Sequence, residues 1–363
     1  MNGTGSGDGF SAEQLGLRDA VRALLKKRSD SAAVRQAIAQ PAGYDEALWR
    51  LLCEQIGVAA LGIPEEFGGA GAGALETHLV LDELGRTLTP TPLLGSAVLA
   101  ARLLLVAGDR DAGTRLLPLI AEGGVVAVCW AGADGDWTAD PSAVALADDG
   151  TLSGEAHYVL DGDTAERLVV VASTPDGPVL VEVDPDQPGV TRAHTPTMDA
   201  TRRLARVVLD RATGTRLEAA DVRAALAGAR DAALVAQTAE QAGAMARLLE
   251  LTVEYTKVRV QFGRPIGSFQ AIKHRLADLH VLVEASRSAS YAAAAGTIAP
   301  AVAAVHCAEA FFTVAAEAIQ LHGGIAITWE HDAHLYFKRA QAGTQLFGAP
   351  SAHLARLSEV VFG

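Results

Sequence analysis

The sequence predicts a mostly α-helical protein with a central antiparallel β domain. Before about residue 123, alanine and leucine recur at helical spacing, and the same kind of pattern returns from about Leu217 almost to the end. Between these parts, short β-branched runs alternate with turn residues. A chain of 363 residues is long enough for two or three domains, which we place at 1–122 (helical), 123–216 (β) and 217–363 (helical).

The first domain begins with a helix-start signal. Ser11 and Gln14 have the spacing of a capping box, which predicts a helix as far as about Lys27. The proline and glycines of residues 63–73 predict a loop. Further helical patterns cover Tyr44–Gln55, Ala74–Gly85 and Ser96–Val106.

The middle domain is predicted from five short apolar runs. Turn residues such as Asp148-Asp-Gly150 and Pro175-Asp-Gly177 separate them, and this spacing indicates antiparallel strands. The runs are Val125–Trp130, Val144–Leu146, Leu168–Ala172, Val179–Val183 and Ala205–Leu209.

The charge balance narrows the class of ligand. With 30 basic and 43 acidic residues the net charge is −13, which argues against a general nucleic-acid binder. Five basic residues nevertheless gather in one short region, and such a local patch suits a phosphate-bearing small molecule. They are Lys257, Arg259, Arg264, Lys273 and Arg275.

Cysteine spacing and hydropathy point to a soluble cytoplasmic protein. Cys53, Cys129 and Cys307 are far apart and form no CxxC pair, so neither a zinc site nor a disulfide framework is indicated. The polar, glycine-rich residues 1–9 do not resemble a signal peptide. No uninterrupted apolar run reaches the roughly 18 residues expected of a membrane span.

The most informative segment is Arg259–Asp278. A helical pattern ends near Arg259, Gly263 and Pro265 break it, and a second helix is predicted from Phe269 to Leu282. Arg259 and Gln270 flank this break, where they could hold a planar or anionic ligand. The alternative is a helix hairpin with a solvated basic loop.

The string Arg259-x-Gln-Phe-Gly-x-Pro-Ile-Gly-x-Phe-Gln270 resembles the FAD-contacting segment of acyl-CoA dehydrogenases. Gln320-x-x-Gly-Gly324 is similar to a second segment of that family, which meets the adenine end of the flavin nucleotide. Matches to the family's first helical domain occur around Leu48–Gly57, at Ile63–Gly69 and at Glu83–Arg86. The resemblance covers nearly the whole chain and implies an α-helical domain, a β domain and a four-helix-bundle domain.

The resemblance also implies FAD as cofactor and α,β-dehydrogenation of an acyl-CoA thioester. In that reaction a carboxylate removes the α proton while the β hydride passes to the flavin. Arg259 suits the pyrophosphate because its guanidinium presents planar donors, and a glycine pair permits close backbone approach. The implied cofactor-binding residues are Arg259, Gln261, Phe262, Ile266, Gln270, Gln320, Gly323 and Gly324.

The position of the catalytic base departs from the family pattern. The family's Tyr-Glu-Gly-Thr segment corresponds here to Leu346–Ala349, and we align Gly348 with the glutamate. Some members carry the glutamate on an earlier helix, at a position that falls near Ala233. Asp231 is the one weak candidate for a displaced base. Two residues are about 200° apart around a helix, so it should face another way.

The residues that correspond to the family's flavin-ring platform also differ from the family pattern. The family's Thr-Glu-Pro-Gly-Ala-Gly-Ser-Asp loop corresponds to Trp130–Asp136, which lacks its serine and threonine hydroxyls. The later Trp-Ile-Thr-Asn string becomes Tyr158–Asp161, where Tyr158 could still stack but Leu160 has no hydroxyl. Pro350 and Ala352 replace the residues that make the family's second adenine contact.

This combination resembles the non-catalytic subunit of two-plus-two heterotetrameric acyl-CoA dehydrogenases. In actinobacteria such complexes oxidise steroid side-chain CoA thioesters. The implied partners are a catalytic subunit, an acyl-CoA substrate and an electron-transfer flavoprotein or similar acceptor. Two alternatives stay open: a complete homo-oligomeric dehydrogenase using Asp231, and a flavin-free acyl-CoA-binding or structural protein.

Four histidines lie in the C-terminal part. They are His322, His331, His334 and His353, and no carboxylate–histidine motif of known spacing frames them. We therefore predict no metal site and place these side chains on helix surfaces.

Overall fold

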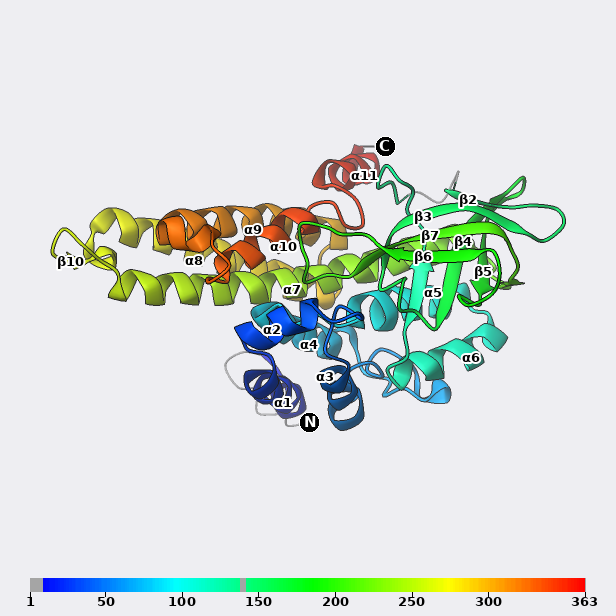
Figure 1. The fold of residues 1–363 in the computed structure, drawn as a ribbon, viewed down its shortest axis with the longest axis horizontal. Helices are drawn as coiled ribbons and strands as arrows, with labels where there is room; N and C mark the ends of the chain where they lie inside the picture. Colours follow the sequence, from blue (N-terminus) through cyan, green and yellow to red (C-terminus); the bar gives the residue numbers. More distant parts are fainter. Residues whose placement is uncertain (1–8, 138–141, 363) are drawn as a thin grey trace. The chain divides into compact units, whose positions relative to one another are not determined.

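The computed structural model describes residues 9–137 and 142–362. Its elements follow the predicted order of helices, strands and helices (Figure 1). The chain packs into two compact units, each discontinuous in sequence. The first unit contains the N-terminal part to Ile38, His78–Thr89 and the chain from Leu234, whereas the second contains Ala39–Thr77 and Pro90–Ala233.

The helices before the sheet form largely where the sequence predicts them. The capping box is present, because Ser11 Oγ accepts from the Gln14 N–H (3.2 Å) and Gln14 Oε1 accepts from the Ser11 N–H (3.0 Å). The elements are α1 (Ala12–Arg28), α2 (Ser31–Ile38), α3 (Glu46–Leu51), the π-helical turn η1 (Leu52–Ile56), the 3-10 turn η2 (Glu65–Phe67), α4 (Ala74–Thr87), the π-helical segment η3 (Leu93–Ala100), α5 (Ala101–Ala107) and α6 (Arg110–Ala121).

The middle part is an eight-stranded sheet in the order β6-β7-β3-β2-β4-β5-β8, with β1 also paired to β4. Its strands are β1 (Val126–Cys129), β2 (Val144–Leu146), β3 (Leu152–Leu160), β4 (Arg167–Thr174), β5 (Gly177–Val183), β6 (Val190–His194), β7 (Leu204–Ala212) and β8 (Thr215–Arg216). Valine, leucine and alanine side chains of these strands form one buried cluster.

Most strand pairs are antiparallel, as predicted, but the sheet is mixed. β1 and β2 both pair with β4 in parallel, at Val126–Cys129 and at Ala145. Apolar runs of this length carry no signal of strand direction, so the sequence could not distinguish the two arrangements. The polar strands β3 and β6 are not predicted by the apolar runs, because few of their positions are fully buried.

The C-terminal helices are α7 (Val222–Val258), α8 (Gln270–Ala294), α9 (Pro300–His322), α10 (Ala333–Gly343) and α11 (Pro350–Phe362), with the 3-10 turns η4 (Ile266–Ser268) and η5 (Gly323–Ile327). α9 packs against α8, α10 and α11, and Phe311 and Val314 lie in the core cluster of this unit. Residues Pro300–Ile327 are long and apolar enough to cross a membrane by length and composition, and half of the 18-residue apolar window within them is buried inside the protein. Val302 and Phe312 of α9 are exposed, so packing within this chain covers only part of the apolar side chains of the helix.

Candidate functional site

The α7–α8 connection is a tight hairpin (Figure 1). Its strands are β9 (Val260–Gln261) and β10 (Arg264–Pro265), with Gln261 opposite Arg264. The turn residues Phe262 and Gly263 both have positive φ, 52° and 76°, as in two-residue type I′ turns. Asparagine and glycine favour this conformation, whereas it strains an aromatic residue. Phe262 is nevertheless 92% exposed, so packing within the chain does not explain it.

The predicted ligand-binding side chains of this hairpin point into open surroundings. Arg259 and Gln261 are exposed, and the backbone of Arg259 is fixed by hydrogen bonds to Tyr255 (2.9 Å) and Ile266 (2.8 Å). Ile266 is half-buried, and the exposed Gln270 has its Nε2 2.8 Å from Nε2 of His274. A rigid backbone therefore presents polar groups that the chain itself barely uses.

The second predicted segment lies against the base of this hairpin. The Tyr255 ring packs on His322 with centroids 4.5 Å apart, and the Tyr255 hydroxyl donates to the His322 carbonyl (3.1 Å). Gln320 is exposed on the last turn of α9, and Gly323 and Gly324 follow it. The structure thus brings both predicted segments to one end of the helical bundle, which we call the bundle end (residues 255–270 and 320–332).

The two glycines of the bundle end differ in what requires them. Gly323 has φ +67° and ψ −147°, a backbone conformation that is almost restricted to glycine. Gly324 has no positive φ, and a Cβ placed on it would meet nothing within 4 Å. The fold therefore does not need glycine at 324. The open space beside it fits the close approach of a ligand or another chain.

Exposed apolar side chains accompany these polar groups. Val258 at the end of α7, Val260 and Phe262 in the hairpin, and Ile327 and Trp329 after Gly324 are all exposed. Large exposed apolar side chains of this kind occur at contact surfaces.

The turn before α11, at Phe347 and Gly348, is packed against the protein core rather than exposed. Phe347 is fully buried with φ 64°, and Gly348 has φ 111°. A Cβ on Gly348 would lie 3.5 Å from the ring of His353, which is itself buried. Counted along Leu346–Ala349, the second position of the family's Tyr-Glu-Gly-Thr segment is Phe347 and the third is Gly348, so the alignment of Gly348 with the glutamate is one residue off. Neither a phenyl ring nor a glycine can accept a proton.

Asp231, the candidate for a displaced base, lies away from the position at which other family members carry their glutamate. It is exposed on α7, whereas Ala233, the position aligned with the displaced glutamate of other family members, is fully buried. The two side chains therefore lie on different sides of the helix, as the helical spacing predicts.

The middle-domain residues aligned with the flavin platform form a packed corner. Trp130 and Trp137 meet edge to face with centroids 5.6 Å apart, and both are buried. Tyr158 has φ 53° at an irregularity in β3, and its hydroxyl donates to the Ala133 carbonyl (3.3 Å). Leu160 is buried and its aliphatic side chain carries no hydroxyl. This corner therefore offers the aromatic ring of Tyr158 but no hydroxyl at position 160.

The prediction of surface histidines is wrong. His322, His334 and His353 are buried and His331 is half-buried. The rings of His322, His331 and His334 pack on one another or on aromatic neighbours. His322 lies 4.4 Å from His331, and His334 meets Trp329 edge to face at 4.8 Å. Burial lowers the pKa of His334 to about 4 and also lowers that of His322. Within residues 9–137 and 142–362, no group of three potential ligand side chains could hold a metal ion.

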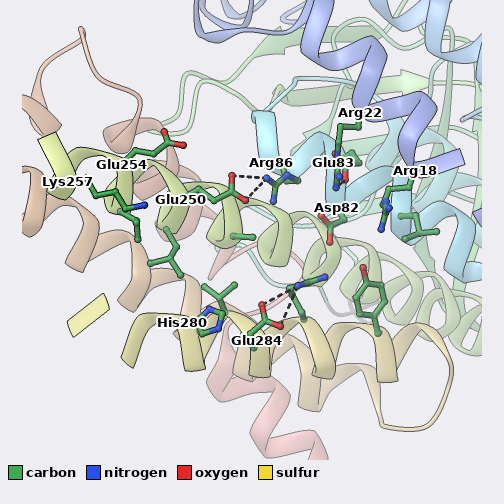
Figure 2. Close-up of a pocket in the computed structure, with 17 residues that line it drawn as sticks. Arg18, Arg22, Asp82, Glu83, Arg86, Glu250, Glu254, Lys257, His280 and Glu284 are labelled. Carbon is green, nitrogen blue, oxygen red and sulfur yellow. Dashed lines mark hydrogen bonds and ion pairs between the residues drawn. The ribbon is translucent and has the colours of Figure 1, made fainter. Parts of the chain in front are cut away.

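A separate cavity of about 630 Å³ lies between α1, α4, α7 and α8 (Figure 2). Ion pairs on its walls join Arg22 to Glu83, Arg86 to Glu250 and Arg287 to Glu284. Burial raises the pKa of Asp82 to about 6, with the neighbouring carboxylate of Glu83 adding to the effect. These walls are charged and internally paired, unlike the mostly apolar pockets that enclose acyl chains.

Two family models match the sequence. The acyl-CoA dehydrogenase N-terminal domain matches residues 11–124, and the acyl-CoA dehydrogenase C-terminal domain matches residues 220–362. The chain belongs to the acyl-CoA dehydrogenase family. Members of this family are FAD flavoproteins with oxidoreductase activity.

Individual relatives agree over almost the whole length. Acyl-CoA dehydrogenase IpdE2 of Mycolicibacterium smegmatis is 43% identical over 355 residues, which cover 97% of this chain and 100% of that protein. Among solved structures, the ChsE4-ChsE5 complex from Mycobacterium tuberculosis is similar with a TM-score of 0.86 and 29% identity, covering 96% of this chain and 97% of the other. The steroid ACAD Tcur3481-Tcur3483 is similar with a TM-score of 0.83 and 30% identity over the same shares.

Proposed function

We propose that this chain is a subunit of an FAD-dependent acyl-CoA dehydrogenase complex, in which it supplies groups for the nucleotide end of the FAD to a catalytic partner. One contrast inside a single compact unit carries the proposal. Arg259, Gln320 and Gly324 are exposed at the bundle end, while the turn at Phe347–Gly348 is closed and has no carboxylate.

The bundle end fits the nucleotide part of FAD in its chemistry. The planar donors of the Arg259 guanidinium suit a pyrophosphate, and the Gln320 amide can donate and accept hydrogen bonds. The space beside Gly324 lets a ligand come close to the backbone N–H. When bound, FAD supplies the hydride acceptor of the reaction. The role of this chain's residues is to bind and orient the nucleotide end, and the proton-accepting carboxylate comes from the partner.

The exposed apolar residues support a second subunit at the same place. Phe262, Ile327 and Trp329 are large side chains of the kind that dominate protein interfaces. The similar ChsE4-ChsE5 structure is a complex, and the similar Tcur3481-Tcur3483 structure is a steroid ACAD. We therefore propose a two-plus-two heterotetramer that acts on an acyl-CoA thioester of the steroid side-chain class.

The test is expression of the chain alone and together with a candidate catalytic acyl-CoA dehydrogenase subunit. FAD-to-protein ratio, native mass and acyl-CoA oxidation are measured on both samples. We expect one FAD per two chains and turnover only in the mixed tetramer. One FAD per chain in an active homo-oligomer would contradict the proposal, and Asp231→Asn would then test Asp231 as the base.

A further inference from the structure

An arginine near the N-terminus is bonded to the loop that follows Gly324. The Arg35 guanidinium on α2 donates to the Asp332 carboxylate (2.8 Å) and to the His331 carbonyl (3.3 Å). Ser31, one turn earlier, donates to the same carboxylate oxygen (2.6 Å). Asp332 stands at the N-cap of α10 but makes no capping bond there. Its carboxylate is committed to α2 instead.

The same arginine helps to hold the exposed tryptophan of this loop. The Arg35 guanidinium lies 5.7 Å from the centre of the Trp329 ring, and the Lys338 ammonium lies 4.7 Å from it. The Trp329 ring also meets the His334 ring edge to face. Trp329 is 67% exposed, so these contacts fix its orientation without covering it.

The inner side of the loop is held by neutral rings. His331 packs on His322, His322 packs on Tyr255, and His331 Nδ1 accepts from the Ala333 N–H (3.1 Å). Burial lowers the pKa of His331, which favours its uncharged form. The loop of residues 323–332 is thus bonded from α2 on one side and packed on α7 and α9 on the other.

We propose that Arg35 is a positioning residue that fixes the 323–332 loop, and with it the Gly323–Gly324 backbone, in the conformation that receives the nucleotide. The inference rests on the proposed function of the bundle end. A guanidinium can bond a carboxylate and a carbonyl at once in fixed directions, which a lysine ammonium cannot reproduce. The unused cap of α10 shows that Asp332 serves this contact rather than its own helix.

The first experiment uses the full chain without FAD or partner. Hydrogen exchange of the 323–332 amides and acrylamide quenching of tryptophan fluorescence report the loop directly. Quenching is selective because Trp49, Trp130 and Trp137 are buried and Trp329 is exposed. For Arg35→Ala we expect about tenfold faster exchange in the loop, the scale of one lost charge-assisted hydrogen bond, together with stronger quenching. Asp332→Asn leaves Arg35 beside the indole and should act in the same direction.

The second experiment measures the FAD dissociation constant of the mixed complex. Arg35→Ala and Arg35→Lys should both raise it about tenfold, whereas Arg28→Ala, an exposed arginine at the end of α1, should not. A loosened loop with unchanged FAD affinity would overturn the proposed role of the bundle end, although Arg35 would still order the loop. An unchanged loop in Arg35→Ala would overturn the positioning inference, whatever the FAD affinity.

Discussion

The bundle end and the turn before α11 belong to the same compact unit, yet the residues at their functional positions are exposed in the first and packed in the second. At the bundle end, Arg259, Gln320 and Phe262 face open space on a backbone held by many contacts. In the turn, Phe347 is sealed in the core and His353 stands against Gly348. Ordered backbone with unused side chains indicates a surface prepared for another molecule. At the turn, neither Phe347 nor Gly348 offers a side-chain group that can accept a proton.

The largest effect should come from Arg259. Arg259→Ala in the mixed complex removes the guanidinium proposed to bind the pyrophosphate, and we expect FAD affinity to fall about 10- to 100-fold, as for a charge-assisted bond of about 1.5–3 kcal/mol. The free energy of unfolding of the chain alone should hardly change, because the side chain is exposed. Equilibrium dialysis of the complex against FAD measures the effect.

Lys273→Ala is the matched control for Arg259. It removes an exposed positive charge near the same hairpin but no planar set of donors. An equal loss of FAD affinity in both variants would mean that the bundle end senses net charge alone. The bundle end would then not be a specific nucleotide site, and its contrast with the buried turn before α11 would have no functional meaning.

Phe262 tests whether the strained turn serves an interface. Phe262→Asn places a residue that favours positive φ at this position, so the chain alone should gain about 0.5–1 kcal/mol in stability. The same change removes an exposed aromatic contact and should weaken assembly with the partner about tenfold, within the usual range for an interface aromatic. Urea unfolding and analytical ultracentrifugation separate the two effects. A more stable chain that assembles normally would remove Phe262 from the interface.

Much of this arrangement follows from local sequence signals, and the rest depends on packing at long range. The Ser11–Gln14 box and the break at Gly263 are local, so spacing alone predicts them correctly, whereas α8 continues to Ala294, beyond the predicted end at Leu282. The parallel pairing of β1 with β4 and the burial of His334 depend on neighbours far along the chain. No local pattern reveals such contacts.

The candidate site divides in the same way. The resemblance selects Arg259, Gln320 and Gly324 by their motifs, and the structure places these segments at one end of the bundle. Arg35 and Trp329 carry no motif, since their importance lies in a contact across almost 300 residues of sequence. The sequence feature that could have drawn attention to this contact is Asp332. Its position just before a helix favours a helix cap, which is not the role that it has in the structure.

Substitutions of Gly324 and Gly348 test directly whether the bundle end and the turn before α11 differ in function. Gly324→Ala should leave the stability of the chain unchanged or slightly higher, because the added Cβ meets open space and φ is not positive. In the complex it should weaken FAD binding. Gly348→Ala should instead cost about 1–2 kcal/mol of stability, because φ is 111° there, and should leave FAD affinity alone. If both variants behaved alike, the two regions would not differ in function.

The smallest effect concerns the pH dependence of stability at His334, which lies on α10 just after the bundle end. Burial lowers the pKa of His334 to about 4, against 6.5 for the free side chain, so the unfolded chain takes up this proton first as the pH falls. The stability contributed by the neutral ring is therefore complete above about pH 6.5 and is lost progressively between 6.5 and 4. His334→Phe keeps a ring beside Trp329 and removes the titration. Urea unfolding should show the variant gaining on the order of 1 kcal/mol over the parent between pH 7 and pH 4.5. The same pH dependence of stability in His334→Phe and in the parent would assign the acid sensitivity to the chain in general rather than to the buried ring of His334.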